Sequence, residues 1–96
     1  MTLNTKQKSY LRGLAHKLKP VVMIGNAGVT EGVINEIQSS LQHHELIKIR
    51  ISGMDRPERQ ATVDAICGQT SSNLVTTIGH IAVLYRRADK PQIKLP

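Results

Sequence analysis

The amino-acid sequence predicts an α/β (α+β-like) domain with the order α-β-α-β-α-β-β and a four-stranded mixed sheet. Three segments carry apolar residues at three- and four-residue steps, and short β-branched runs alternate with them. Strands separated by helices favour parallel neighbours with right-handed crossovers, whereas two final runs joined by Gly79-His80 favour an antiparallel hairpin. With 96 residues, the chain is long enough for one domain, residues 1–96, around one core.

The first predicted helix covers residues 5–17, with Thr5 as its N-cap and Pro20 as the residue that stops it. One apolar stripe and a mostly separate set of basic residues predict a helix that is apolar on one side and basic on the other. The stripe consists of Leu11, Leu14, Ala15 and Leu18. The basic residues are Lys6, Lys8, Arg12 and Lys17.

A short apolar run at residues 21–24 predicts a buried strand, and a glycine-containing loop follows it. Thr30 is the expected N-cap of a second helix, with Glu31 in its positive first turn. This helix is expected to fray near His43-His44. Its core stripe is Val33, Ile34, Ile37 and Leu41.

The segment LIKIRI, residues 46–51, alternates apolar and basic residues and predicts a strand with one face on the core and one in water. The string Asp55-Arg56-Pro57-Glu58 is typical of a capping box with proline in the first turn, and the third helix is expected to end around Gly68. Residues 74–78 and 81–85 form the predicted hairpin. Residues 87–96 predict an extended surface tail.

Charge is unevenly distributed along the chain, whose net charge is +6. Residues 1–28 carry five Lys and Arg and no acidic residue, residues 29–85 have a net charge of −2, and residues 86–96 have +3. Two basic ends around a mildly acidic middle favour a polyanionic partner. The alternative is that the positive charge serves only solubility.

The sequence contains no pattern typical of an enzyme or of a cofactor site. It lacks the phosphate loop of ATPases, and Gly25-x-x-Gly28 lacks the third glycine of a dinucleotide fingerprint. His43 and His44 are adjacent, a spacing that metal-ligand pairs rarely use, and Cys67 is expected to be a packed thiol. We therefore expect a protein that is not an enzyme, with no cofactor, no metal and no small-molecule substrate.

The scarcity of cysteine and of aromatic residues constrains the cellular compartment of the protein and its mode of binding. The single cysteine, the polar start and the short aliphatic runs predict a cytoplasmic protein without membrane association. Monomer is the default expectation. Two tyrosines are the only aromatic side chains, which argues against RNA-binding folds that stack bases on aromatic rings.

The stretch Gly25-Asn26-Ala27-Gly28 lies where a strand is expected to lead into a helix. A helix N-terminus offers unpaired backbone N–H groups, and glycines before it let a phosphate approach the backbone. The alternative is a tight turn in which glycine supplies a positive φ and nothing binds. The basic segments on both sides favour the phosphate-binding interpretation.

An ordered set of motifs runs through TKQKSYLRGLAHKLKPVVMIGNAGVTEGVINEIQSSLQHHELIKIRI and GHIAVLYRRADKPQIKLP. The set comprises LRGLAH, Lys-Pro before the strand, Gly-x-x-Gly, a Glu-bearing helix start, HHELIK and the closing VLYR. Together these motifs resemble the bacterial YhbY-type CRM domain, the chloroplast RNA splicing and ribosome maturation module. The resemblance covers nearly the whole chain.

The resemblance implies an RNA-binding module whose fold is similar to the C-terminal domain of translation initiation factor 3. It also implies an association with precursors of the large ribosomal subunit, as in stand-alone bacterial members, whereas plant relatives use the domain in group II intron splicing. The family's loop corresponds to Gly25, Asn26, Ala27 and Gly28. Many members carry a basic residue inside the loop. Asn26-Ala27 here leaves the contacts to backbone amides and to neighbouring Lys and Arg.

The leading hypothesis is therefore an RNA-binding protein that contacts ribosomal RNA during assembly of the large subunit. A second hypothesis is a protein-interaction module that docks on a ribosomal protein or assembly factor, and a third is a small-molecule phosphate binder. The RNA-binding residues expected at the loop are Gly25, Asn26, Ala27 and Gly28. Flanking basic residues are Lys6, Lys8, Arg12, Lys17 and Lys19, if the first helix turns its polar side toward the loop, with Lys48, Arg50, Arg86 and Arg87 as extensions.

Overall fold

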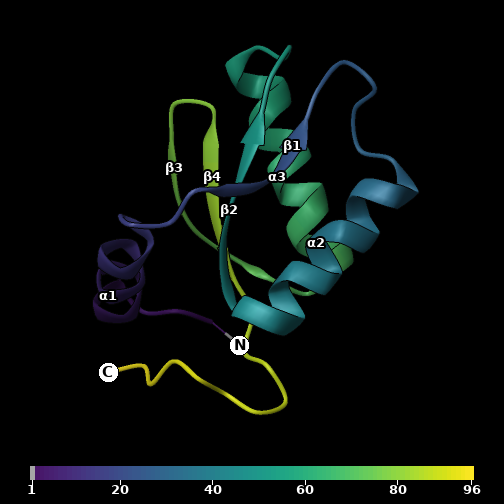
Figure 1. The fold of residues 1–96 in the computed structure, drawn as a ribbon. Helices are drawn as coiled ribbons and strands as arrows, with labels where there is room; N and C mark the ends of the chain where they lie inside the picture. The colour runs from purple at the N-terminus through teal and green to yellow at the C-terminus, as the bar shows by residue number, and fades with distance from the viewer. Residues whose placement is uncertain (1) are drawn as a thin grey trace.

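A computed structural model describes residues 2–96 and confirms the predicted α/β fold with its four-stranded mixed sheet (Figure 1). Every predicted helix and strand is present, in the predicted order. The helices are α1 (Thr5–Ala15), α2 (Glu31–His44) and α3 (Arg56–Thr70). The strands are β1 (Pro20–Ile24), β2 (Leu46–Ile51), β3 (Asn73–Ile78) and β4 (Ile81–Tyr85).

The strands lie in the order β1-β2-β4-β3 across the sheet. β1 and β2 are parallel, and β4 is antiparallel to both β2 and β3. The expectation of parallel neighbours is thus confirmed for β1 and β2. It is wrong for β2 and β3, because β4 inserts between them and pairs with both.

Capping side chains set where each helix begins. Asn4, and not Thr5, is the N-cap of α1, since its side chain accepts the N–H of Gln7 at 2.8 Å and the Gln7 side chain accepts the N–H of Asn4 at 3.1 Å. Thr30 and Asp55 cap α2 and α3 as predicted, by accepting the N–H three residues on. The predicted ends are less accurate, because α1 stops at Ala15 and α3 continues past Gly68 to Thr70.

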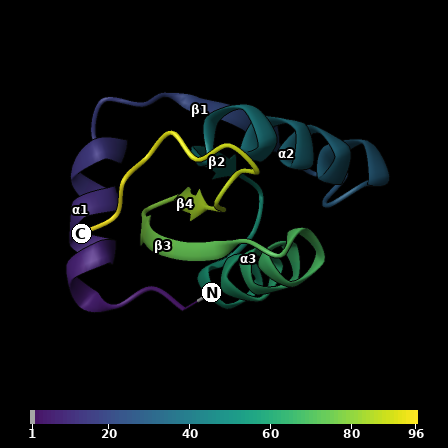
Figure 2. The ribbon, with the colours of Figure 1, turned by 90° about the horizontal axis from the view of Figure 1, so that it is seen from below.

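Two apolar clusters cover the two faces of the sheet, with α2 and α3 on one side and α1 on the other (Figure 2). The larger cluster includes Ile24, Ile37, Ile49, Ile66 and Leu84. The smaller consists of Leu3, Leu11, Ala15, Leu46, Val75, Val83 and Tyr85. The expectation that one face of β2 lies in water is therefore wrong at its start, where Leu46 is buried on the α1 side, and it holds at the exposed Arg50.

The C-terminal segment after β4 forms no helix or strand, and it packs back on the domain. Ile93 and Leu95 pack against the smaller cluster. The carboxylate of Glu45 accepts backbone N–H groups from Ala88 at 3.0 Å, Gln92 at 2.6 Å and Ile93 at 2.9 Å.

Glu45 is 1% exposed and has a φ of 62°, so the chain reverses sharply immediately after His44. Burial alone would raise the pKa of this carboxyl. The three backbone N–H donors and the Arg87 charge outweigh burial, so the pKa is lowered. The predicted end of α2 near His43-His44 is confirmed, because the helix ends at His44 and its C-cap, Glu45, anchors the tail.

Candidate nucleic-acid interface

Three connections meet at one end of the sheet, which we call the loop end: residues 25–30, 52–55 and 79–80. The parallel β1 and β2 both finish there, with Ile24 opposite Ile51, and the antiparallel β4 begins there. Backbone hydrogen bonds join the connections, since Ser52 N–H donates to Ile24 O and Ile51 N–H donates to His80 O, both at 2.8 Å. The loop end lies at the top of Figure 1.

The glycine loop is a tight turn closed by Gly28 N–H donating to Gly25 O at 2.9 Å. Gly28 has a φ of 71°, a conformation that favours glycine. A Cβ placed at Gly25 or Gly28 would meet nothing within 4 Å, and Asn26 and Ala27 are exposed. Open space therefore lies beside the turn, and a ligand can approach its backbone.

The start of α2 adds further backbone donors next to the turn. Thr30 Oγ1 accepts the N–H of Val33 at 3.1 Å, whereas the N–H groups of Glu31 and Gly32 lie in the first turn, where no intrahelical acceptor exists. Glu31 places an exposed carboxylate at the same helix end. An anion bound here would be stabilised by the backbone amides and destabilised by repulsion from this carboxylate.

Among the predicted basic residues, Arg50 lies closest in register to the loop end. It is exposed, pairs across the sheet with Met23 and Ile81, and lies on the half of the sheet face that α1 leaves open. Met23 and Ile78, on the same face, are 63% and 61% exposed. Arg50 therefore presents a cation on an open, partly apolar part of the sheet.

The structure does not bring the basic residues of the first helix around the glycine turn. α1 packs near the other end of the sheet, and the turn lies at the opposite corner of the molecule in both views (Figures 1 and 2). The five residues of β1 separate the two by about 16 Å at the usual rise per residue. Lys6, Lys8, Arg12, Lys17 and Lys19 are exposed and form a separate basic region.

Two of the basic residues predicted to extend the RNA-binding surface, Lys48 and Arg86, form hydrogen bonds within the protein. Lys48 Nζ donates to Leu18 O at 3.0 Å, which ties β2 to the end of the α1 segment. The Arg86 guanidinium donates to Thr70 O at 2.9 Å, to Gln38 O at 3.2 Å and to the Gln38 side chain, and so joins α3 to α2. Arg87 is exposed beside Glu45, at the end of the sheet away from the turn.

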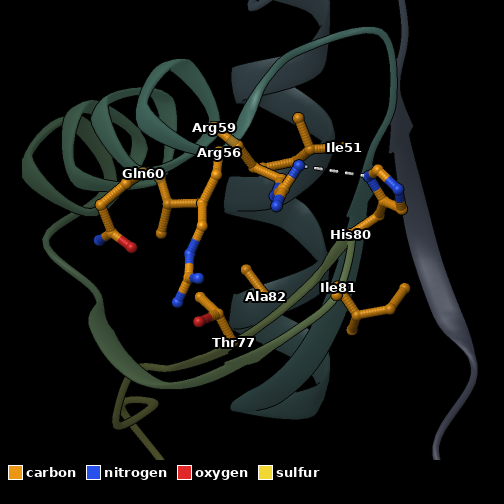
Figure 3. Close-up of a pocket in the computed structure, with 10 residues that line it drawn as sticks. Ile51, Arg56, Arg59, Gln60, Thr77, His80, Ile81 and Ala82 are labelled. Atoms are coloured by element: carbon orange, nitrogen blue, oxygen red, sulfur yellow. Dashed lines mark hydrogen bonds between the residues drawn. The ribbon is translucent and has the colours of Figure 1, made fainter.

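Sequence reasoning missed a basic cleft at the loop end (Figure 3). A cavity of about 310 Å³ lies between α3 and the β3–β4 hairpin, and its lining includes Arg56, Arg59 and His80. One feature of the sequence could have indicated that the start of α3 lies at the loop end. Helices that follow parallel strands begin at the same edge where those strands end, so the first turn of α3 belongs with the glycine turn.

No group of three or more His, Cys, Asp or Glu among residues 2–96 is placed to hold a metal ion. Cys67 is half-buried against the larger cluster, and burial raises the pKa of its thiol, so the thiolate is disfavoured. None of the helices within this described range is long and apolar enough to span a membrane.

Comparison with known proteins connects this arrangement to a family. The sequence model of the CRS1 / YhbY (CRM) domain matches residues 3–86. The chain belongs to the CRM domain family. The recognition based on the ordered motifs is thereby confirmed.

Two bacterial relatives of this CRM domain are similar over most of their length. A Haemophilus influenzae protein named RNA-binding protein is 54% identical over 95 residues, which cover 99% of this chain and 96% of the relative. A Pseudomonas aeruginosa protein with a similar name is 40% identical, covering 99% of this chain and 91% of the relative. The solution structure of SAV1595 from Staphylococcus aureus superposes with a TM-score of 0.86 at 35% identity, covering 99% of this chain and all of that one.

Proposed function

We propose that this CRM domain binds RNA through the loop end, that its target is ribosomal RNA, and that it acts in assembly of the large ribosomal subunit. The observation that carries the proposal is the open turn at Gly25–Gly28, beside which a phosphate can reach the backbone. The names of the full-length relatives support RNA as the partner. The domain then acts as a monomer in the cytoplasm and is not an enzyme.

The chemistry of the surface supports contact with the RNA backbone over reading of bases. Among its described residues, the loop end has no Phe, Tyr or Trp ring on which a base could stack, since the two tyrosines lie in α1 and at the end of β4. Arg50 supplies a charge on the neighbouring sheet face. The exposed lysines and arginines of the α1 region extend the positive surface away from the turn. Binding should therefore depend strongly on salt concentration.

The test is fluorescence anisotropy with structured ribosomal RNA fragments across a salt series. The wild type is compared with Gly28→Asp, which places a negative charge on the turn, and with Gly28→Asn, which has nearly the same size and the same strain at φ 71° without the charge. Both variants are first shown to be folded by circular dichroism. Salt-dependent binding that Gly28→Asp loses and Gly28→Asn largely keeps is the expected result. Equal binding by all three proteins would remove the turn from the interface.

A second candidate function is docking on a ribosomal protein or assembly factor. A groove of about 500 Å³ between the α1 region, β1 and the C-terminal segment favours it, because exposed Leu14, Leu18 and Val21 lie in its lining. On this alternative, the protein would still co-purify with ribosomal particles at high salt. Leu14→Glu would abolish this co-purification, and Gly28→Asp would leave it unchanged. Loss of the co-purification at high salt would count against it.

A further inference from the structure

The cleft between α3 and the β3–β4 hairpin combines cationic walls with an apolar floor (Figure 3). Arg56 and Arg59 project from the first turns of α3, and Arg56 extends toward Thr77 of the hairpin. The floor is formed by Ile51, Val63 and Ala82. No acidic side chain is among the lining residues, so two guanidinium charges enter the cleft without a carboxylate opposite them.

Arg59 is held in a fixed position at the edge of the cleft. Its Nη1 donates to Met54 O at 3.3 Å and lies 3.4 Å from Nδ1 of His80. A guanidinium has no acceptor atom, so Arg59 is the donor and His80 Nδ1 the acceptor in that contact. Of the five N–H donors of Arg59, these two bonds use the pair on Nη1 and leave three for a ligand.

These features match the chemistry of a phosphodiester. Arginine binds phosphate in a bidentate manner with charge-assisted hydrogen bonds, and Thr77, Gln60 and His80 add further polar groups around the same space. A volume of about 310 Å³ lies at the lower limit of small-ligand pockets, so the cleft has room for one nucleotide unit.

A continuous line of contacts joins the cleft to the glycine turn. Asn26, in the turn, lies against Gly53 of the 52–55 connection. The next residue, Met54, accepts the bond from Arg59, which in turn contacts His80. One strand of nucleic acid can therefore follow the loop end from the turn to the cleft.

We propose that the cleft lined by Arg56, Arg59 and His80 holds a backbone phosphate of the same RNA strand whose backbone rests on Gly25–Gly28. This rests on the proposed function, because it assumes that RNA occupies the turn. The cleft is then a second phosphate-binding site, and the two sites together define the path of the bound strand across the loop end.

The test uses a fluorescein-labelled single-stranded oligonucleotide copied from ribosomal RNA, with anisotropy measured over a salt series. Arg56→Gln combined with Arg59→Gln is expected to lower affinity about tenfold or more and to reduce the log–log salt slope by about 0.7, as for one phosphate. The matched control is Lys90→Gln combined with Lys94→Gln, which removes the same charge from the C-terminal segment. An equal loss in the control would show that only net charge matters and would overturn the proposal.

Arg59→Gln also removes a bond to the 52–55 connection. Arg56→Gln alone therefore serves as a second variant, because this exposed side chain makes no hydrogen bond within residues 2–96. Its affinity for the same oligonucleotide should fall. In parallel, the amide resonances of Gly79 and His80 should shift when that oligonucleotide is added to the wild type. If Gly28→Asp loses binding while both cleft variants bind like the wild type, the cleft is not used and the proposed function stands. If the wild type binds no RNA, both proposals fail.

Discussion

The side chain of Asn26 lies against Gly53, so closely that a Cβ built at Gly53 would stand 2.6 Å from Asn26 Oδ1. Gly53 also has a φ of 78°. The glycine turn thus packs against a third glycine, Gly53, which lies 25 residues beyond Gly28 in the sequence. The position of the turn depends on this contact as well as on the two glycines within it.

Gly53→Ala should therefore displace Asn26 and weaken RNA binding. We expect a stability cost of about 1–3 kcal/mol from the left-handed backbone conformation, together with lower affinity for ribosomal RNA fragments. Urea denaturation and anisotropy measure the two effects. The control is Gly13→Ala, in α1, where a Cβ meets nothing within 4 Å and alanine should stabilise the helix by about 0.5–1 kcal/mol. Unchanged RNA affinity in Gly53→Ala would contradict the bracing role.

Removing the carboxylate at the start of α2 should strengthen RNA binding. Glu31→Gln deletes an exposed negative charge beside the turn, so affinity at low salt should rise by a few fold. The helix should lose about 0.3–1 kcal/mol, because the charge interacts favourably with the helix dipole. Anisotropy at low and high salt checks this, with Glu36→Gln, farther along α2, as the comparison. Weaker binding by Glu31→Gln would mean that phosphate does not approach this helix end.

The anchoring of the C-terminal segment should make stability depend on pH. The folded-state pKa of Glu45 is lowered, so its contribution is fully present above the unfolded-state pKa, about 4.3, and is lost as the pH falls through the folded-state value. Glu45→Gln should cost about 2–3 kcal/mol at pH 7, because three N–H donors lose a charged acceptor.

The measurement for Glu45 is urea denaturation of the wild type and of Glu45→Gln between pH 7 and pH 3. The gap between the two proteins should narrow as the wild-type carboxyl takes up a proton. A gap that stays constant over this range would show that the charge of Glu45 contributes nothing. Glu36→Gln, at an exposed position of α2, should leave stability nearly unchanged at every pH.

Substitutions at Arg86 and at Arg87 should differ in their effect on the stability of the fold. Arg86→Gln removes the hydrogen bonds from Arg86 to Gln38 in α2 and to Thr70 in α3. It should destabilise the fold by about 2–3 kcal/mol, with little effect on the affinity of the folded variant. Arg87→Gln, at the exposed neighbour, should change stability by less than about 0.5 kcal/mol. Thermal melting and anisotropy report the two effects. A large loss of affinity in folded Arg86→Gln would return this residue to the RNA-binding surface.

Local signals were sufficient to predict the elements of the fold. The three- and four-residue periodicity, the caps at Thr30 and Asp55, and the hairpin glycine all act within a few residues, and each is confirmed. The cap of α1 was assigned one residue late, because Asn4 and Gln7 satisfy each other's backbone N–H groups and Thr5 does not.

Features that depend on distant segments could not be predicted in this way. Nothing local to Lys48 reveals that α1 folds over its face of the sheet, and nothing near Glu45 reveals that residues 88–93 will return to it. The same holds for the cleft, where Arg59 and His80 meet only because β4 inserts between β2 and β3. The separation of the α1 lysines from the glycine turn likewise follows from packing.

The return of the C-terminal segment also decides how the domain can be connected to other chains. Gln7 Nε2 donates to Pro96 O at 3.3 Å, so Pro96 lies beside the start of α1. Both connection points lie away from the loop end (Figure 1). A protein that contains several such domains in series, or one such domain within a larger protein, can therefore place every interdomain linker on the side opposite the loop end. The surfaces proposed to hold RNA then all remain unobstructed.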